Sequence, residues 1–103
     1  VLDYQRGYPP VENAAAQVEE AAAVAREVAG MAGVATDRPA EMGGEDFAYM
    51  LQEKPGAYIW IGNGDGEGSC MVHNPGYDFN DEILPLGATW WVKMAEKSLP
   101  PIA

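Results

Sequence analysis

The sequence predicts an α/β fold, because segments rich in aromatic and β-branched residues alternate with segments of helical periodicity. Glycine and proline separate these segments, as expected for short connections between elements. The chain has 103 residues, which is enough for one domain at most. The expected order is strand, helix, strand, helix, strand, loop and helix.

The first strand is expected over residues 1–8, and it ends at Pro9 and Pro10 because proline cannot continue a strand ladder. Asn13 offers an N-cap for a helix over residues 14–29. The apolar positions of this segment recur every three or four residues, which is typical of one face of an amphipathic helix. They are Ala15, Val18, Ala22, Ala25 and Ala29.

In the middle of the chain, the sequence predicts a second helix with one strand before it and one strand after it. A short strand is expected over residues 34–36. Glu45 and Asp46 then provide negative charge where the positive end of a helix over residues 45–53 should lie. Residues 57–62 have the aromatic and β-branched content of a buried strand.

A glycine-rich polar loop over residues 63–69 follows this strand. It lacks the lysine of a phosphate loop, and its acids would repel phosphate. Twelve positions into a calcium loop that started at Asp65 the chain has Gly76 rather than glutamate. The sequence therefore favours a plain mobile loop, which could form the rim of a pocket.

The last helix is expected after Asp81, with Pro85 in its first turn, a position that proline favours. One face of this helix is apolar and should be buried. Its residues are Leu84, Ala88, Trp91, Ala95 and Leu99.

Composition limits the classes of partner. Six basic and sixteen acidic residues give a net charge of −10, which argues against nucleic acid and anionic membrane surfaces. No apolar run approaches the roughly 18 residues of a membrane span. A single cysteine excludes an internal disulfide framework and predicts a cytoplasmic location. The chain begins at Val1 rather than methionine, which favours a truncated N-terminus, although processing would look the same.

His73 is the only histidine. Imidazole is a common metal ligand, but a metal site needs three or more ligands. His73 therefore either anchors a turn by a hydrogen bond or contributes one ligand to a site completed elsewhere. Cys70 has no second pair of ligands at zinc-finger spacing and is expected to be a small buried residue. Gly43 and Gly44 could let a ligand approach backbone N–H groups, but taken alone they favour a tight turn.

Several short motifs, in the order in which they occur, resemble those of one enzyme family. They are Gly43 to Phe47, Pro55-Gly56, the hydrophobic segment ending at Gly62, and His73-Asn74-Pro75 with the following Tyr77 to Asp81. Together they resemble the C-terminal region of the metallo-amidohydrolases that include hippurate hydrolases, N-acyl-amino-acid amidohydrolases and auxin-conjugate hydrolases. Tyr8-Pro9-Pro10 and Asn13 are similar to the family's passage from its lid domain to its catalytic domain.

The resemblance implies a two-metal aminopeptidase-like α/β catalytic domain with an inserted ferredoxin-like lid. Residues 1–10 would then be the last strand of the lid, which is the dimerisation domain, and residues 11–103 the C-terminal portion of the catalytic domain. His73 resembles the family's last metal ligand. The turn formed by Gly43, Gly44 and Glu45 resembles the segment that borders the substrate cleft.

The family's other metal ligands and its general-base glutamate lie upstream, so no catalytic residue is expected in this chain. Cys70 is not the family's ligand cysteine, because it stands in a different motif. An acceptor for the second imidazole nitrogen of His73 is expected, with Asp78 and Asp81 both open as candidates. The metals implied are two divalent ions, manganese or zinc.

The hypothesis is therefore a C-terminal fragment of a metal-dependent amidohydrolase that cleaves N-acyl amino acids, in a parent protein that is a homodimer. The alternative is a free-standing α/β module that binds a partner through Trp60, Trp90 and Trp91. A weaker option is an inactive remnant.

Overall fold

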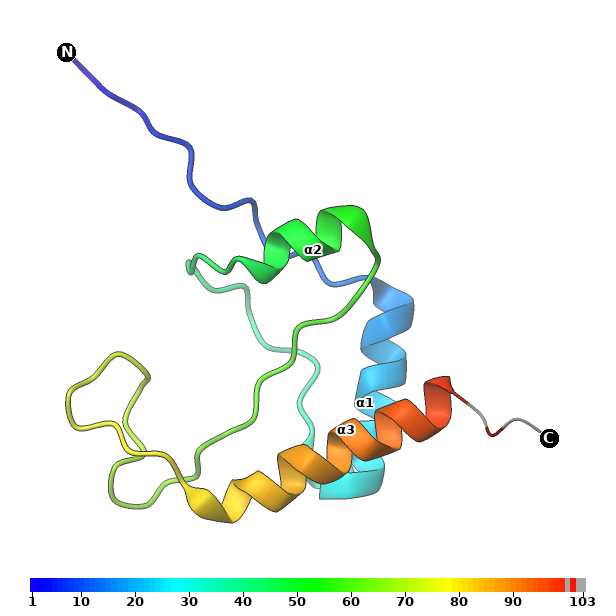
Figure 1. Cartoon of the computed structure of the whole chain (residues 1–103). Helices are drawn as coiled ribbons and strands as arrows, with labels where there is room; N and C mark the ends of the chain where they lie inside the picture. The colour runs from blue at the N-terminus through cyan, green and yellow to red at the C-terminus, as the bar shows by residue number, and fades with distance from the viewer. Residues whose placement is uncertain (100, 102–103) are drawn as a thin grey trace.

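The computed structural model describes residues 1–99 and 101, and this part of the chain contains three α-helices and two single-turn 3₁₀ helices (Figure 1). The elements are α1 (Ala15–Ala29), η1 (Met31–Gly33), α2 (Phe47–Glu53), η2 (Asp81–Ile83) and α3 (Leu84–Ser98). The three predicted helices are thus confirmed to within a few residues. No helix in the described residues is long and apolar enough to cross a bilayer.

The helix α1 forms where alanine-rich periodicity predicts it, and it ends at Gly30. This glycine has a positive φ of 76°, and its N–H donates to the carbonyl of Arg26 at 2.9 Å, which closes the last turn. The predicted N-cap is wrong. Ala14 occupies the N-cap position, and no side chain caps the first turn.

The core of the described chain lies where α3 crosses α1. Trp90 of α3 is 7% exposed and packs on Ala21 and Val24 of α1, and its indole Nε1 donates to the carbonyl of Ala21 at 3.2 Å. The hydrogen bond satisfies the one polar group of a buried indole. Partly buried neighbours complete this cluster; they are Ala25, Val28, Ala57 and Met94.

The face of α3 that was predicted to be buried is wrong, because the buried face lies at a different position around the helix axis. Leu84, Trp91 and Leu99 are exposed, whereas the inward positions fall on the stripe that includes Gly87 and Trp90. The reason is that α1 and the segment before residue 62 cover only one side of α3. At Gly87 an added Cβ would lie 3.2 Å from Cδ1 of Ile61, so the missing side chain permits this close approach.

None of the three predicted strands forms in the described residues, and the α/β class and the lid strand are therefore not confirmed. Strands at residues 1–8, 34–36 and 57–62 each need a neighbouring strand to hydrogen-bond with. The amide group of the Asn13 side chain takes the place of such a neighbour for one residue. Its Oδ1 accepts from the N–H of Tyr58 at 2.7 Å and its Nδ2 donates to the carbonyl of Tyr58 at 3.3 Å.

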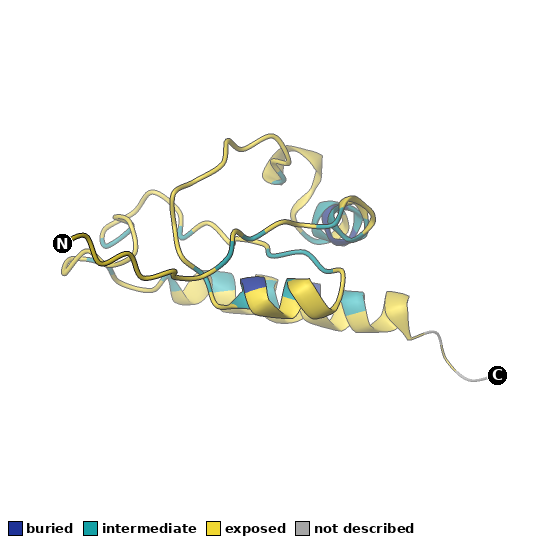
Figure 2. Ribbon diagram, turned by 90° about the horizontal axis from the view of Figure 1, so that it is seen from above, coloured by how far each residue is buried: buried dark blue, intermediate teal, exposed yellow. Residues whose placement is uncertain are grey.

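The chain is more extended than a self-contained domain. Its Cα radius of gyration is 16.5 Å, compared with about 13 Å for a compact domain of 100 residues. Exposed positions, drawn in yellow in Figure 2, cover most of the molecule, and the buried positions in dark blue are few. The described residues therefore enclose only a small core between α1 and α3.

Candidate functional site

His73 lies in an exposed loop and has a positive φ of 68°, which no other non-glycine residue among those described adopts. Histidine tolerates this left-handed conformation better than most residues, and such uncommon backbone conformations cluster at functional sites. In the described residues its side chain makes no hydrogen bond. The turn-anchoring bond is therefore absent, and neither Asp78 nor Asp81 accepts from its ring there.

The turn after His73 is held by the side chain of Asn74. Its Oδ1 accepts from the N–H of Gly76 at 2.9 Å, and its carbonyl accepts from the N–H of Tyr77 at 3.0 Å. On the other side, the N–H of Asn74 donates to the carbonyl of Met71 at 3.2 Å. His73 is thus the third residue of the turn from Met71 to Asn74, and a second turn from Asn74 to Tyr77 follows directly, so both constrain the backbone that carries the imidazole.

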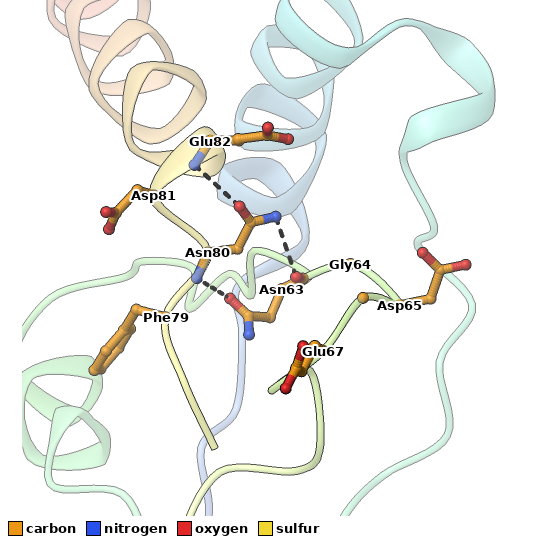
Figure 3. A pocket seen from close by; sticks show the side chains of 9 residues that line it. Asn63, Gly64, Asp65, Glu67, Phe79, Asn80, Asp81 and Glu82 are labelled. Carbon is orange, nitrogen blue, oxygen red and sulfur yellow. Dashed lines mark hydrogen bonds between the residues drawn. The ribbon is translucent and has the colours of Figure 1, made fainter. Parts of the chain in front are cut away.

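Two asparagines close the base of the loop at residues 64–79, which we term the His73 loop. Asn63 donates from Nδ2 to the carbonyl of Asp78 at 2.7 Å and accepts at Oδ1 from the N–H of Asn80 at 2.9 Å. Asn80 donates in return from Nδ2 to the carbonyl of Asn63 at 3.3 Å. Figure 3 shows the two amide groups side by side. We term this pair the asparagine clasp.

A second crossing lies farther up the same loop, at Gly68. This glycine has a φ of 81°, and its carbonyl accepts from the N–H of Asp78 at 2.9 Å. A Cβ at this position would lie 2.8 Å from the Cβ of Asp78 and 3.3 Å from its backbone nitrogen. Only glycine therefore satisfies both the backbone angle and the close approach.

An open depression of about 490 Å³ borders the asparagine clasp. Its acidic lining residues are Asp65, Glu67, Asp81 and Glu82. Figure 3 shows these four carboxylates spread around the clasp, without convergence on a common point. Within the described residues no group of three or more histidine, cysteine, aspartate or glutamate side chains is placed to hold a metal ion.

The Gly43–Glu45 turn precedes α2, which begins at Phe47 rather than at the predicted residue 45. Glu45 accepts from the N–H of Phe47 at 3.2 Å and from the hydroxyl of Tyr58 at 3.1 Å. The hydrogen bond from Phe47 is the largest of several that hold the pKa of Glu45 below its usual value. The bond to Glu45 in turn raises the pKa of Tyr58. The carboxylate therefore secures the turn.

The two glycines of this turn have different surroundings. A Cβ on Gly44 would lie 3.1 Å from the ring of Tyr8, whereas one on Gly43 would meet no atom within 4 Å. The close approach that paired glycines allow is thus made at Gly44 by the N-terminal segment of this chain. The backbone of Gly43 remains open to a ligand.

The predicted site residues do not form one complete site in the described chain. No hydrogen bond links the His73 loop to the Gly43–Glu45 turn there, and the two occupy separate segments in Figure 1. One free, exposed imidazole fits the role of a single metal ligand but cannot hold a metal alone. Cys70 is exposed rather than buried, which corrects the expectation for this residue.

Sequence reasoning missed the residues that hold the candidate site together. The roles of Asn63, Asn80 and Tyr58 depend on partners far along the chain, which no local pattern reveals. A signal for Asn63 was its position between two glycines, where a side chain that both donates and accepts can reach backbone groups.

The sequence has recognisable relatives. The family model described as "Peptidase family M20/M25/M40" matches residues 1–97. A "Putative amidohydrolase YhaA" of Bacillus subtilis is 32% identical over 82% of this chain and 22% of its own length. A "Hippurate hydrolase" of Campylobacter jejuni is 33% identical over 80% of this chain and 21% of its own length.

A third relative is named as a ligase rather than as a hydrolase. A "Putative glutamate--cysteine ligase 2-3" of Rhodococcus jostii is 33% identical over 84% of this chain, which covers 11% of that protein. The chain thus spans about a fifth or less of the length of these three relatives. No solved structure matches the chain at a significant level.

Proposed function

Because the chain belongs to the peptidase family M20/M25/M40, we propose that it is the C-terminal part of a metal-dependent amidohydrolase. The substrate class that we propose is N-acyl amino acids of the hippurate type, whose amide bond the enzyme cleaves. Support comes from relatives named amidohydrolase and hippurate hydrolase, which align over most of this chain. Since the chain corresponds to about a fifth of those proteins, the activity is proposed for the complete protein.

The observation that carries the proposal is the state of His73. Its imidazole is exposed, makes no hydrogen bond within the described residues, and is presented from a loop fixed at its base. A histidine whose role was to anchor the local turn would form hydrogen bonds to that turn through its ring nitrogens. The free imidazole instead suits a ligand that completes a site formed with residues outside this chain.

Two divalent metal ions, manganese or zinc, would supply Lewis-acid activation of water and of the scissile carbonyl. The described residues contribute one ligand to such a site, and the general base belongs to another part of the protein. Gly43, Gly44 and Glu45 would border the substrate. In that role the backbone of Gly43 faces the ligand, while Glu45 holds the turn through Phe47 and Tyr58.

A second function, a free-standing partner-binding module, is favoured by the exposure of Trp60 and Trp91, each 68% exposed. Trp90 cannot contribute to such a surface, because it is buried against α1. We favour the enzyme, since a segment of a larger domain also exposes the faces that its missing neighbours cover. A cytoplasmic location and a homodimeric parent complete the proposal.

The test is His73→Ala in the complete protein, with Cys70→Ser as a control in the same exposed loop. Loss of a residue that hydrogen-bonds to a metal ligand lowers activity by up to about 100-fold. Loss of the ligand itself should therefore lower kcat/KM by at least about 100-fold. Metal content by atomic emission spectrometry should fall in the histidine variant and stay complete in the cysteine variant. Near-normal turnover with full metal content in His73→Ala would refute the ligand assignment.

A further inference from the structure

We propose that Asn63 and Asn80 are positioning residues for His73. The asparagine clasp closes the base of the His73 loop, and it thereby determines where the loop presents the imidazole. This inference rests on the proposed function, because it assigns the clasp a purpose only if His73 is a ligand.

The clasp binds backbone on both sides of the loop. The Asn63 side chain bridges the carbonyl of Asp78 and the N–H of Asn80, and Asn80 returns a bond to the carbonyl of Asn63. The loop between these contacts has little burial of its own, since most of its residues are exposed. Its geometry therefore depends on the hydrogen bonds at its base and on the crossing at Gly68.

Asn80 also connects the loop to the helix pair. Its Oδ1 accepts from the N–H of Glu82 at 3.0 Å, and its carbonyl accepts from the N–H of Ile83 at 3.1 Å. These bonds begin η2, which continues directly into α3. Because Trp90 fixes α3 against α1, the clasp places the His73 loop in a defined relation to the small core.

The chemistry of the clasp needs amides. Asn63 must donate to one backbone group and accept from another, and among side chains of its size only an amide has both functions in this geometry. An aspartate would keep the acceptor for Asn80 and would place negative charge against the carbonyl of Asp78. In Asn80→Asp the acceptor for Glu82 survives, while a carboxylate oxygen replaces the donor to the carbonyl of Asn63.

The experiment compares Asn63→Ala with Asn13→Ala in the complete protein. Asn13 is a matched control, because its side chain also makes one donated and one accepted bond to backbone, but to Tyr58 outside the loop. Without added metal, hydrogen exchange of a peptide covering residues 64–80 should accelerate about tenfold or more in Asn63→Ala, as expected for two lost hydrogen bonds. The control should leave that peptide unchanged.

Metal affinity is the second readout, measured by titration with Mn²⁺ or Zn²⁺. It should fall about 10- to 100-fold in Asn63→Ala and remain unchanged in Asn13→Ala. Asn80→Asp should lie between the Asn63 variant and the unmodified protein, since it keeps the cap of η2.

The outcomes separate this inference from the proposed function. Unchanged loop exchange or unchanged metal affinity in Asn63→Ala, in a protein whose His73→Ala variant loses metal, would overturn the clasp as a positioning device. Full metal binding in His73→Ala would overturn the proposed function and the inference with it. An equal loss of metal affinity in Asn13→Ala would show that the clasp contributes only to folding in general. That result would also overturn the inference.

Discussion

The α1–α3 pair and the His73 loop are held together by different forces. The helix pair is stabilised by burial, with Trp90 and Val24 almost fully enclosed. The loop is exposed and is held by hydrogen bonds from asparagine side chains, and two of its glycines, Gly64 and Gly68, have a positive φ. The helix pair is thus sensitive to side-chain volume, whereas the loop is sensitive to backbone angles and to donor and acceptor placement.

This difference separates stability from the candidate chemistry. The apolar packing lies in elements that contain no predicted ligand, and the candidate ligand lies in a segment with almost no apolar packing. A change in one region should therefore leave the other largely intact, apart from the shared start of α3. Substitutions placed in the helix pair and in the His73 loop test that separation.

The largest expected effect is on the helix pair, from Trp90→Ala. Removing a buried indole should destabilise the α1–α3 packing by about 3–5 kcal/mol. The adjacent Trp91 is 68% exposed, and Trp91→Ala should cost about 0.5 kcal/mol or less in the chain of residues 1–103. Hydrogen exchange of the α1 amides in both variants measures the difference. Equal effects would show that the burial described for Trp90 does not support the pair.

A smaller effect, confined to the loop, is expected from Gly68→Ala. The left-handed backbone costs about 1–2 kcal/mol for a residue with a Cβ, and the contact with Asp78 adds to that cost. Gly66 is the matched control, since a Cβ there would meet no atom within 4 Å. Exchange of the Asp78 amide should accelerate only in Gly68→Ala, with helix content by circular dichroism unchanged. Loss of helix content in Gly68→Ala would show instead that the loop and the helix pair unfold as one cooperative unit.

The smallest effect concerns the Gly43–Glu45 turn, through Tyr58→Phe. Because the folded state lowers the pKa of Glu45, its contribution to stability is present above the ordinary carboxyl pKa and is lost as the pH falls through the lowered value. Removing the Tyr58 hydroxyl should move the pKa of Glu45 back toward its ordinary value.

The measurement is an NMR titration of the Glu45 side chain, with Tyr49→Phe as a control. Tyr49 packs edge to face on Tyr8 and gives no hydrogen bond to Glu45. An unchanged titration in Tyr58→Phe would mean that Phe47 and Asp46 lower the pKa of Glu45 without Tyr58, and the turn would then be independent of the segment at residues 57–62.

The helices could be predicted because their signals are local. Alanine periodicity in α1, the acids before α2, and Pro85 in the first turn of α3 all act within one or two turns. The inward face of α3 could not be predicted from the same periodicity. Apolar residues occur all around this helix, and only the position of α1 decides that Trp90 rather than Trp91 is buried.

The position of His73 in a loop could be predicted from the sequence, but the residues that hold this loop could not. The motif around His73 predicted a histidine in a loop, and the structure places it in a loop and shows that it is exposed. The asparagine clasp joins positions 17 residues apart, so it depends on how the loop closes. The metal-ligand and substrate roles remain predictions, because the described residues bring no group of three or more possible ligands together.

The bond between Asn13 and Tyr58 has a consequence for the behaviour of the chain in solution. Asn13 satisfies the backbone of a single residue in an extended apolar segment, and within the described residues Ile59 to Ile61 have no backbone partner. Their backbone N–H and C=O groups are therefore available to a second extended chain, and the side chain of Trp60 is 68% exposed beside them. This is the arrangement from which cross-β association grows. In the complete protein that we propose, residues outside this chain would thus protect this segment against self-association as well as complete the site.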